Sequence, residues 1–270
     1  MSLDTWNKPN WCPGCGNFGI WNALKLAIED LKLTREEVVM TGGIGCSSKI
    51  PYWVNVNAFC GLHGRPVSLA AGIKLMNPKL TVIACGGDGD GYSEGVQHFI
   101  HFCKDNFDIA YFIHNNQIYG LTKGQASPTS DEGFITKTTP WGAFKALNPV
   151  STALGAGATF VARGFAGDMQ GLKGLMKKAI KHKGAALVDI LQPCVTFNKK
   201  NTFAWYKERI YELKKPFKTR AEAFKESLKW GDKIPIGVFY QSKEKTMGDH
   251  LPKPGKVKKR SIGKLLKELM

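Results

Sequence analysis

The chain has 270 residues, 43% of them hydrophobic, and carries a formal net charge of +16. This length and composition are typical of one large α/β domain with appendages, or of two small domains, and they exclude a disordered chain. No apolar run approaches the ~20 residues of a membrane-spanning helix, and the first residues lack the apolar core of a signal peptide, so we expect a cytoplasmic protein that binds no membrane.

Short apolar runs alternate with segments of helical period between residues 16 and 194, which predicts a parallel sheet with helices on both faces. The expected strands are, in chain order, Val38–Thr41, Leu80–Cys85, Ile109–His114, Thr159–Ala162 and Ala185–Leu191. The expected helices span 18–32, 66–76, 91–104 and 168–183. The sequence therefore predicts an α/β fold built on a doubly wound, mostly parallel sheet.

The segment beyond residue 198 is less regular. A predicted helix over 218–229 is followed by a tail that contains Pro252, Pro254 and nine Lys or Arg between residues 243 and 270. We therefore divide the chain into a ligand-binding domain over 1–198 and a C-terminal extension with a basic tail over 199–270.

The most specific motif is Gly87-Asp88-Gly89-Asp90 directly after one expected strand, matched by Asn115-Asn116 directly after the next. Both lie at the carboxyl ends of parallel strands, where open α/β sheets bind ligands. Glycines let a diphosphate approach the backbone, and a carboxylate with an amide oxygen supplies hard ligands to Mg²⁺. The alternative is a helix cap at Asp88 and an ordinary turn at Asn115-Asn116, which the joint spacing disfavours.

The seven cysteines are expected to be free thiols or metal ligands, because disulfides are rare in a reducing cytoplasm. Four lie in polar loops at element ends, namely Cys12, Cys15, Cys46 and Cys194. Four thiolates suit a tetrahedral zinc or a [4Fe–4S] cluster, and their spacing alone does not separate the two. A redox dithiol at Cys12 and Cys15 is a third interpretation. The others, Cys60, Cys85 and Cys103, lie in or beside apolar runs and are expected to be buried hydrophobes.

Together these motifs resemble the β subunit of the 2-oxoacid:ferredoxin oxidoreductases, the family of pyruvate and 2-oxoglutarate synthases. The resemblance covers about residues 11–198 and includes Leu62-His63-Gly64-Arg65, the run from Asn115 to Gln125, and Gln192-Pro193-Cys194-Val195-Thr196. It implies oxidative decarboxylation of a 2-oxoacid with coenzyme A to acyl-CoA and CO₂. It also implies thiamine diphosphate, Mg²⁺ and one [4Fe–4S] cluster as cofactors, and so selects iron–sulfur over zinc.

The resemblance assigns roles to individual residues. The implied cluster ligands are Cys12, Cys15, Cys46 and Cys194, and the implied Mg²⁺ ligands are Asp88, Asn116 and the backbone carbonyl of Ile118. The implied cofactor-binding residues are Gly45, Ser47, His63, Arg65, Gly87, Asp88, Gly89, Asp90, Asn116, Ile118 and Gly120. The expected catalytic or substrate-facing residues are His63, Lys49 and Leu121. For His63, Arg65 and Lys49 the alternative is a solvated loop residue.

The expected partners are an α or fused αγ subunit that supplies a pyrimidine-binding domain, in an αβ or (αβ)₂ assembly, and an acidic ferredoxin. The sequence has no nicotinamide-binding fingerprint, and a strongly basic chain attracts an anionic electron carrier. A non-oxidative thiamine-diphosphate-dependent decarboxylase or synthase with a structural zinc is the main alternative. A nucleic-acid-binding protein is a second one, which only the net charge supports. The preferred 2-oxoacid stays open.

Overall fold

The computed structural model describes residues 2–252. The part of the predicted basic tail that follows Pro252 lies outside the described residues.

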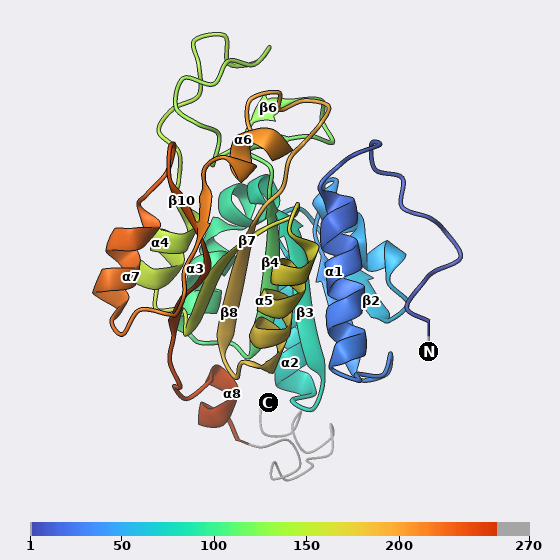
Figure 1. The fold of residues 1–270 in the computed structure, drawn as a ribbon. Helices are drawn as coiled ribbons and strands as arrows, with labels where there is room; N and C mark the ends of the chain where they lie inside the picture. Colours follow the sequence, from blue (N-terminus) through green and yellow to red (C-terminus); the bar gives the residue numbers. More distant parts are fainter. Residues whose placement is uncertain (1, 253–270) are drawn as a thin grey trace, which may run out of the picture.

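Eight strands form one sheet in the order β2-β1-β3-β4-β8-β7-β10-β9 (Figure 1). Their bounds are β1 Val38–Gly42, β2 Asn57–Cys60, β3 Thr81–Gly87, β4 Ile109–Asn115, β7 Phe160–Phe165, β8 Ala185–Leu191, β9 Ile210–Glu212 and β10 Ile234–Gln241. The strands from β2 to β7 in this order pair in parallel, and β10 pairs antiparallel with β7. A small antiparallel pair, β5 Ile118–Tyr119 and β6 Gln125–Ala126, lies apart from the sheet.

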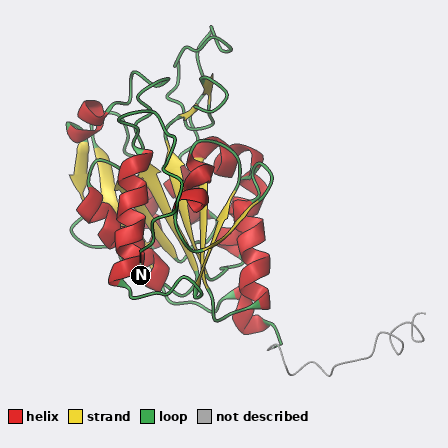
Figure 2. Cartoon of the chain, turned by 90° about the vertical axis from the view of Figure 1, so that its right-hand side faces the viewer, coloured by secondary structure: helices red, strands yellow, loops and turns green. Residues whose placement is uncertain are grey.

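Helices cover both faces of the sheet, as Figures 1 and 2 show. On one face α1 (Asn17–Asp30) lies beside α5 (Met169–Lys181), and their buried Leu24 and Met176 share one apolar cluster with the sheet. The other face carries α2 Pro66–Met76, α3 Val96–Lys104, α4 Pro149–Gly155 and α7 Arg220–Ser227. The first four residues of β8, from Ala185 to Val188, enter the two clusters alternately, as the period of a strand requires. The α/β, doubly wound, mostly parallel sheet is confirmed.

The predicted elements agree with the observed ones to within three residues at each end, with one exception. The helix expected over 91–104 is interrupted, because a π-helical turn, Asp90–Glu94, precedes α3. Such turns are frequent at functional sites. Gly95 allows the interruption, since a side chain there would lie 2.6 Å from the carbonyl oxygens of Asp90 and Gly64.

Several elements were not predicted. They are the edge strand β2, the small pair β5 and β6, the strands β9 and β10, the 3₁₀ segment Ser47–Trp53, and the helices α4, α6 (Phe203–Lys207) and α8 (Met247–His250). Because β9 and β10 join the main sheet, the segment after residue 198 extends it. The domain division at residue 198 stays a prediction. Among the described residues, no helix combines the length and apolarity that crossing a membrane requires.

Candidate active site

Loops that follow β1, β3, β4 and β8 meet at one edge of the sheet, at the top of Figure 1. Parallel strands end at the same edge, so residues far apart in the sequence come together there. One cavity at this edge is lined by predicted site residues: Gly45, Ser47, His63, Gly87, Asp88, Gly89, Asp90, Asn116, Ile118, Gly120 and Leu121. We call it the cradle. Ile44, Cys46, Tyr119 and Thr122 complete its lining.

Asp88 is one of two buried carboxylates that line the cradle, with 1% of its surface exposed. Its Oδ2 lies 2.7 Å from Thr129 Oγ1, which donates to it. Burial raises the pKa of Asp88 to about 6, although hydrogen bonds from Ser127 and Thr129 act in the opposite direction. Within residues 2–252 no lysine, arginine or histidine pairs with this carboxylate. A buried acid without a basic partner is suited to hold a cation.

Thr129 joins Asp88 to the end of β4. Its Oγ1 lies 2.8 Å from Asn115 Oδ1 as well as near Asp88. Both neighbours are acceptors and a hydroxyl has one proton, so Thr129 donates to one of them at a time. Asn115 Nδ2 in turn donates to Asp189 Oδ1 at 3.1 Å, and Asp189 lies 3.5 Å from the buried Arg163. The Asp88 side chain is thus fixed by a network of buried polar groups.

Asn116 and Ile118 face the cradle from the turn after β4. Gln117 between them adopts φ 56°, in the left-handed region, which reverses the chain. Asn116 Oδ1 accepts from the backbone N–H of Ile118 at 3.1 Å, and Asn116 Nδ2 donates to Gln192 Oε1 at 3.0 Å. The amide oxygen of Asn116 therefore points into the turn beside the cradle with a second lone pair available.

Asp90 holds two loops of the site together. Its carboxylate accepts from the backbone N–H groups of Gly64 at 2.7 Å and Ile44 at 3.0 Å, and from Ser48 Oγ at 3.1 Å. His63 Nδ1 lies 2.9 Å from the same carboxylate. Burial raises the pKa of Asp90. These contacts engage both carboxylate oxygens of Asp90. The predicted contact of Asp90 with a cofactor stays a prediction.

Of the residues predicted to bind the organic cofactor or the substrate, two lie outside the cradle. Arg65 is exposed and precedes the first turn of α2, and Lys49 lines a neighbouring cavity. Leu121 lines both cavities and is 45% exposed, which suits a side chain that meets a ligand or another subunit. Their roles stay predictions.

The neighbouring cavity, which we call the cysteine cavity, brings together the four predicted thiols, Cys12, Cys15, Cys46 and Cys194, in a volume of about 200 Å³. All are free cysteines. Cys12 and Cys15 stand at the two ends of a turn closed by the bond from Cys15 N–H to Cys12 O at 3.0 Å. Trp11 Nε1 donates to Cys46 O at 2.7 Å and ties the two loops together. Within residues 2–252, no three His, Cys, Asp or Glu side chains converge tightly enough for a single metal ion.

The thiols differ in environment. Burial raises the pKa of Cys15 to about 12, and the neighbouring thiols act in the same direction. Burial also raises the pKa of Cys46, while Lys49 lowers it. A metal group bound here would displace the thiol protons, because metals bind cysteines as thiolates.

Gly120 separates the cradle from the cysteine cavity and lines both. A methyl group in place of its hydrogen would lie 3.7 Å from the Sγ atoms of Cys46 and Cys194. The two sites are thus adjacent.

Thr129 and Gln192 contact the site but were not assigned roles from the sequence. Thr129 lies in a loop without a motif, and its partner Asp88 is 41 positions away. Gln192 stands beside Cys194 in the Gln-Pro-Cys-Val motif, and this adjacency was the one signal that pointed to it.

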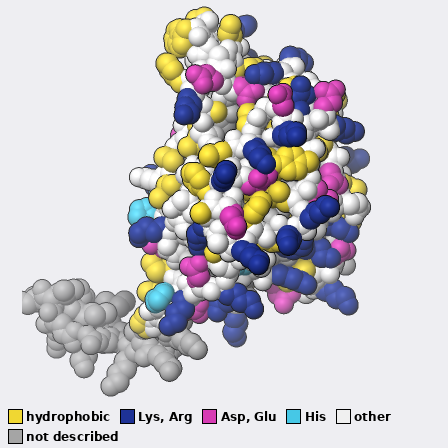
Figure 3. Space-filling view, turned by 60° about the vertical axis from the view of Figure 1, so that its left-hand side comes forward, with side chains coloured by type: hydrophobic (Ala, Val, Ile, Leu, Met, Phe, Trp, Pro, Cys, Tyr) yellow, Lys and Arg dark blue, Asp and Glu magenta, His cyan; other side chains and the backbone are white. Residues whose placement is uncertain are grey.

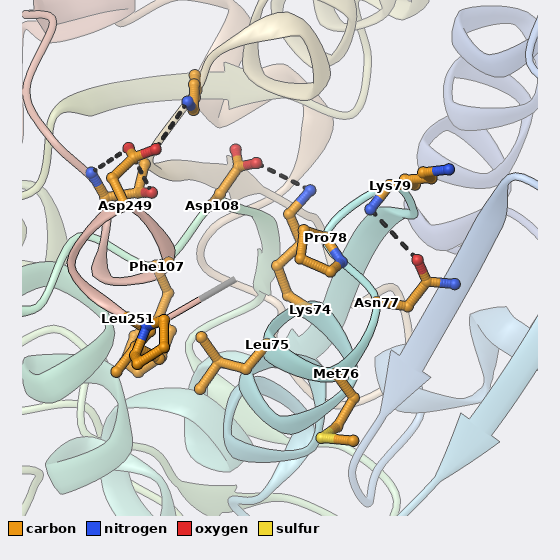
Figure 4. Close-up of a pocket in the computed structure, with 14 residues that line it drawn as sticks. Lys74, Leu75, Met76, Asn77, Pro78, Lys79, Phe107, Asp108, Asp249 and Leu251 are labelled. Carbon is orange, nitrogen blue, oxygen red and sulfur yellow. Dashed lines mark hydrogen bonds and ion pairs between the residues drawn. The ribbon is translucent and has the colours of Figure 1, made fainter. Parts of the chain in front are cut away.

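A further cavity lies at the opposite, amino-terminal edge of the sheet (Figure 4). The end of α2 and the residues before β4 and β8 line it, together with α8. Its lysines Lys74 and Lys183 are paired with Asp108 at 2.8 Å and Asp249 at 3.1 Å. We assign no chemistry to it, because ligands of parallel sheets bind at the carboxyl edge.

Comparison with protein families gives two matches. Residues 43–190 match the thiamine pyrophosphate enzyme, C-terminal TPP binding domain. Residues 194–255 match the family that describes the C-terminal part of the pyruvate ferredoxin oxidoreductase beta subunit. The first match includes the cradle and Cys46, and the second begins at Cys194.

Individual proteins are similar over most of the chain. The 2-oxoacid:ferredoxin oxidoreductase subunit beta of Sulfolobus sp is 49% identical over 253 residues, which cover 88% of this chain and 82% of the relative. The 2-oxoglutarate oxidoreductase subunit KorB of Mycobacterium tuberculosis is 46% identical over 75% of this chain and 54% of its own length. A solved structure, the 2-oxoglutarate:ferredoxin oxidoreductase of Magnetococcus marinus with 2-oxoglutarate, coenzyme A and succinyl-CoA bound, superposes with a TM-score of 0.90. It is 35% identical, covering 99% of this chain and 89% of that one.

Proposed function

The chain belongs to the 2-oxoacid:ferredoxin oxidoreductase β-subunit family, and from this we propose that it oxidises a 2-oxoacid with coenzyme A to acyl-CoA and CO₂ and passes the electrons to a ferredoxin. The observation that carries the proposal is the adjacency of the cradle and the cysteine cavity across Gly120. A cofactor that releases electrons and a centre that accepts them one at a time need such adjacent sites.

In this proposal the cradle binds the diphosphate of thiamine diphosphate through Mg²⁺. The side chains of Asp88 and Asn116 and the carbonyl of Ile118 are the metal ligands. Two features support it, the burial of Asp88 without a basic partner and the glycines beside it. At Gly87, for example, the nearest atom to the position of a side chain is Ser47 Oγ at 3.6 Å, so the missing side chain leaves room on the cradle side. When bound, thiamine diphosphate supplies the carbon nucleophile and the electron sink that decarboxylation of a 2-oxoacid requires.

We further propose that Cys12, Cys15, Cys46 and Cys194 hold one [4Fe–4S] cluster, which would supply one-electron transfer. The four thiols line one cavity of about 200 Å³, and four thiolates are the ligand set of such a cluster. A visible absorption spectrum decides between a cluster and a single zinc ion. We expect a brown protein whose broad absorption bleaches on reduction, whereas a colourless protein with one bound zinc would support the non-oxidative alternative.

The remaining predicted residues act on the substrate side. His63 donates a hydrogen bond towards the diphosphate or substrate, and Asp90, 2.9 Å from its Nδ1, orients the ring. Lys49 and Leu121 contact the 2-oxoacid at the mouth of the cysteine cavity. Arg65 and Ser47 contact the diphosphate. Free thiols are consistent with a cytoplasmic location for this chemistry.

Two protein partners complete the proposed activity. An α subunit supplies the pyrimidine-binding domain, because the motifs of this chain account for the diphosphate end of the cofactor. A small acidic ferredoxin accepts the electrons, for which a net charge of +16 is favourable. Figure 3 shows Lys and Arg side chains spread over one face with Asp and Glu among them. The charge on that face is therefore distributed.

The decisive experiment is an assay of this chain purified alone and together with its α subunit. We expect the complex to reduce ferredoxin with at least one 2-oxoacid from a panel of pyruvate, 2-oxoglutarate and branched-chain acids, in a reaction that requires coenzyme A. We expect the single chain to be inactive. Turnover of a 2-oxoacid to an aldehyde without an electron acceptor would refute the proposal.

A further inference from the structure

The side chain of Gln192 lies between the cradle and the cysteine cavity. Gln192 directly follows β8 and is 1% exposed. Its Oε1 accepts from Asn116 Nδ2 at 3.0 Å, on the cradle side. Its Nε2 donates to Pro193 O at 2.8 Å and to Cys15 Sγ at 3.4 Å, on the thiol side. One amide thus contacts both sites.

The orientation of this amide is fixed by its neighbours. A reversed amide would turn its oxygen towards the carbonyl of Pro193 and the sulfur of Cys15, and its NH₂ towards the NH₂ of Asn116. The contact with Pro193 would then oppose two acceptors, and the contact with Asn116 would oppose two donors. In the observed orientation both N–H groups and the oxygen have partners, so this buried amide has no unsatisfied donor.

The backbone around Gln192 holds the side chain in place. Gln192 N–H donates to Asn115 O at 2.9 Å, and Gly16 N–H donates to Pro193 O at 3.2 Å. A side chain at Gly16 would lie 2.9 Å from Gln192 Cγ, so the glycine that follows Cys15 makes room for the amide. The contacts of the Gln192 side chain with Asn116 and Cys15 therefore depend on three separate loops.

We propose that Gln192 is a positioning residue that holds Asn116 for the metal and, through its N–H donated to Cys15, sets the reduction potential of the cluster. The proposal rests on the proposed function, because it requires a cluster at the four cysteines. An N–H donor near a cluster sulfur stabilises the more negative, reduced state and raises the potential. An amide that only filled space would leave the potential unchanged.

The test is a redox titration of the αβ complex, with the cluster followed by its paramagnetic resonance signal. Gln192→Met retains the length of the side chain and removes its three side-chain hydrogen bonds. We expect a more negative midpoint potential and weaker Mg²⁺-dependent binding of thiamine diphosphate, measured by calorimetry. Gln192→Glu keeps an oxygen for Asn116 and loses the amide donors, so we expect a more negative potential with affinity closer to that of the unmodified protein. If Gln192→Met loses its iron, the midpoint potential is measured in Gln192→Glu instead.

The matched control is Thr129→Val, which alters the contact with Asp88 and none with the thiols. It should weaken cofactor binding and leave the midpoint potential unchanged. Midpoints equal to that of the unmodified complex in both Gln192 variants, with the cluster present, would overturn the inference. Absence of iron from the unmodified complex would overturn the proposed function instead, and the inference with it.

Discussion

Replacing Thr129 by Val should weaken Mg²⁺ binding while leaving the cradle residues themselves intact. The substitution removes a hydroxyl 2.7 Å from Asp88 Oδ2 and 2.8 Å from Asn115 Oδ1, and it changes little in shape. Removing a partner of a metal-ligating side chain typically costs about 10- to 100-fold in metal affinity. At about 1.4 kcal/mol per tenfold this is about 1.4 to 2.8 kcal/mol. A hydrogen bond to a charged group contributes about 1.5 to 3 kcal/mol, so the two values agree.

The assay is calorimetric titration of Mg²⁺ into the complex at saturating thiamine diphosphate. Thr129→Ser is the matched control, because it keeps the hydroxyl and should bind Mg²⁺ within a few-fold of the unmodified protein. Thr129→Val also leaves a buried acceptor without a donor, which costs about 1 to 3 kcal/mol of stability. Thermal unfolding of both variants measures that cost separately. Equal Mg²⁺ affinity of Thr129→Val and the unmodified protein would refute the reasoning.

Four further outcomes are expected. Asp88→Ala should abolish Mg²⁺-dependent binding of thiamine diphosphate and Asn116→Ala should only weaken it, and unchanged calorimetric affinity in Asp88→Ala would show that the metal binds elsewhere. Because burial raises the pKa of Asp88 to about 6, protons compete with Mg²⁺ for the carboxylate below that pH. The apparent Mg²⁺ affinity should therefore fall about tenfold per pH unit below 6 and stay flat above it, whereas a flat profile down to pH 5 would contradict the assignment. Serine in place of Cys12, Cys15, Cys46 or Cys194 should lower the iron content, with Cys60→Ser as the control that retains it. Ferredoxin reduction measured by stopped flow should slow between 0.1 M and 1 M salt, because the Debye length falls from about 10 Å to about 3 Å; a constant rate would show that the net charge does not guide docking.

The sequence was informative where a pattern is local. Ala185–Leu191 is an apolar run interrupted only by Asp189 and buried on both faces, and the strand has the predicted bounds. Asp88 and Asn116 each follow such a run, so their meeting at one edge followed from parallel pairing. The strand β2, Asn57–Cys60, has only four residues, and three of them are exposed, so it lacks the alternation of buried and exposed positions that marks a strand. In β10, Pro235 and Gly237 disfavour a strand. Pro235 lies before the pairing with β7, which begins at Gly237, and is opposite Tyr211 of the edge strand β9.

The polar partners of the site could not be predicted for a different reason. The sequence alone does not distinguish a solvated threonine or glutamine in a loop from a buried one. Only the folded chain brings Thr129 to Asp88 and Gln192 to Cys15, across 41 and 177 positions. Side-chain hydrogen bonds of this kind depend on distances in the folded chain, which the hydrophobic periodicity of the sequence does not predict.

The wall between the cradle and the cysteine cavity restricts how this chain can change during evolution. Cys46, Gly120 and Leu121 line both cavities, so a substitution among them alters the fit of two different ligands together. Lys49 and Thr122 each line one cavity alone. A substitution at Lys49 or Thr122 therefore changes the fit of one ligand and leaves the other site unaltered. Laboratory selection for a different 2-oxoacid is best begun at these two positions.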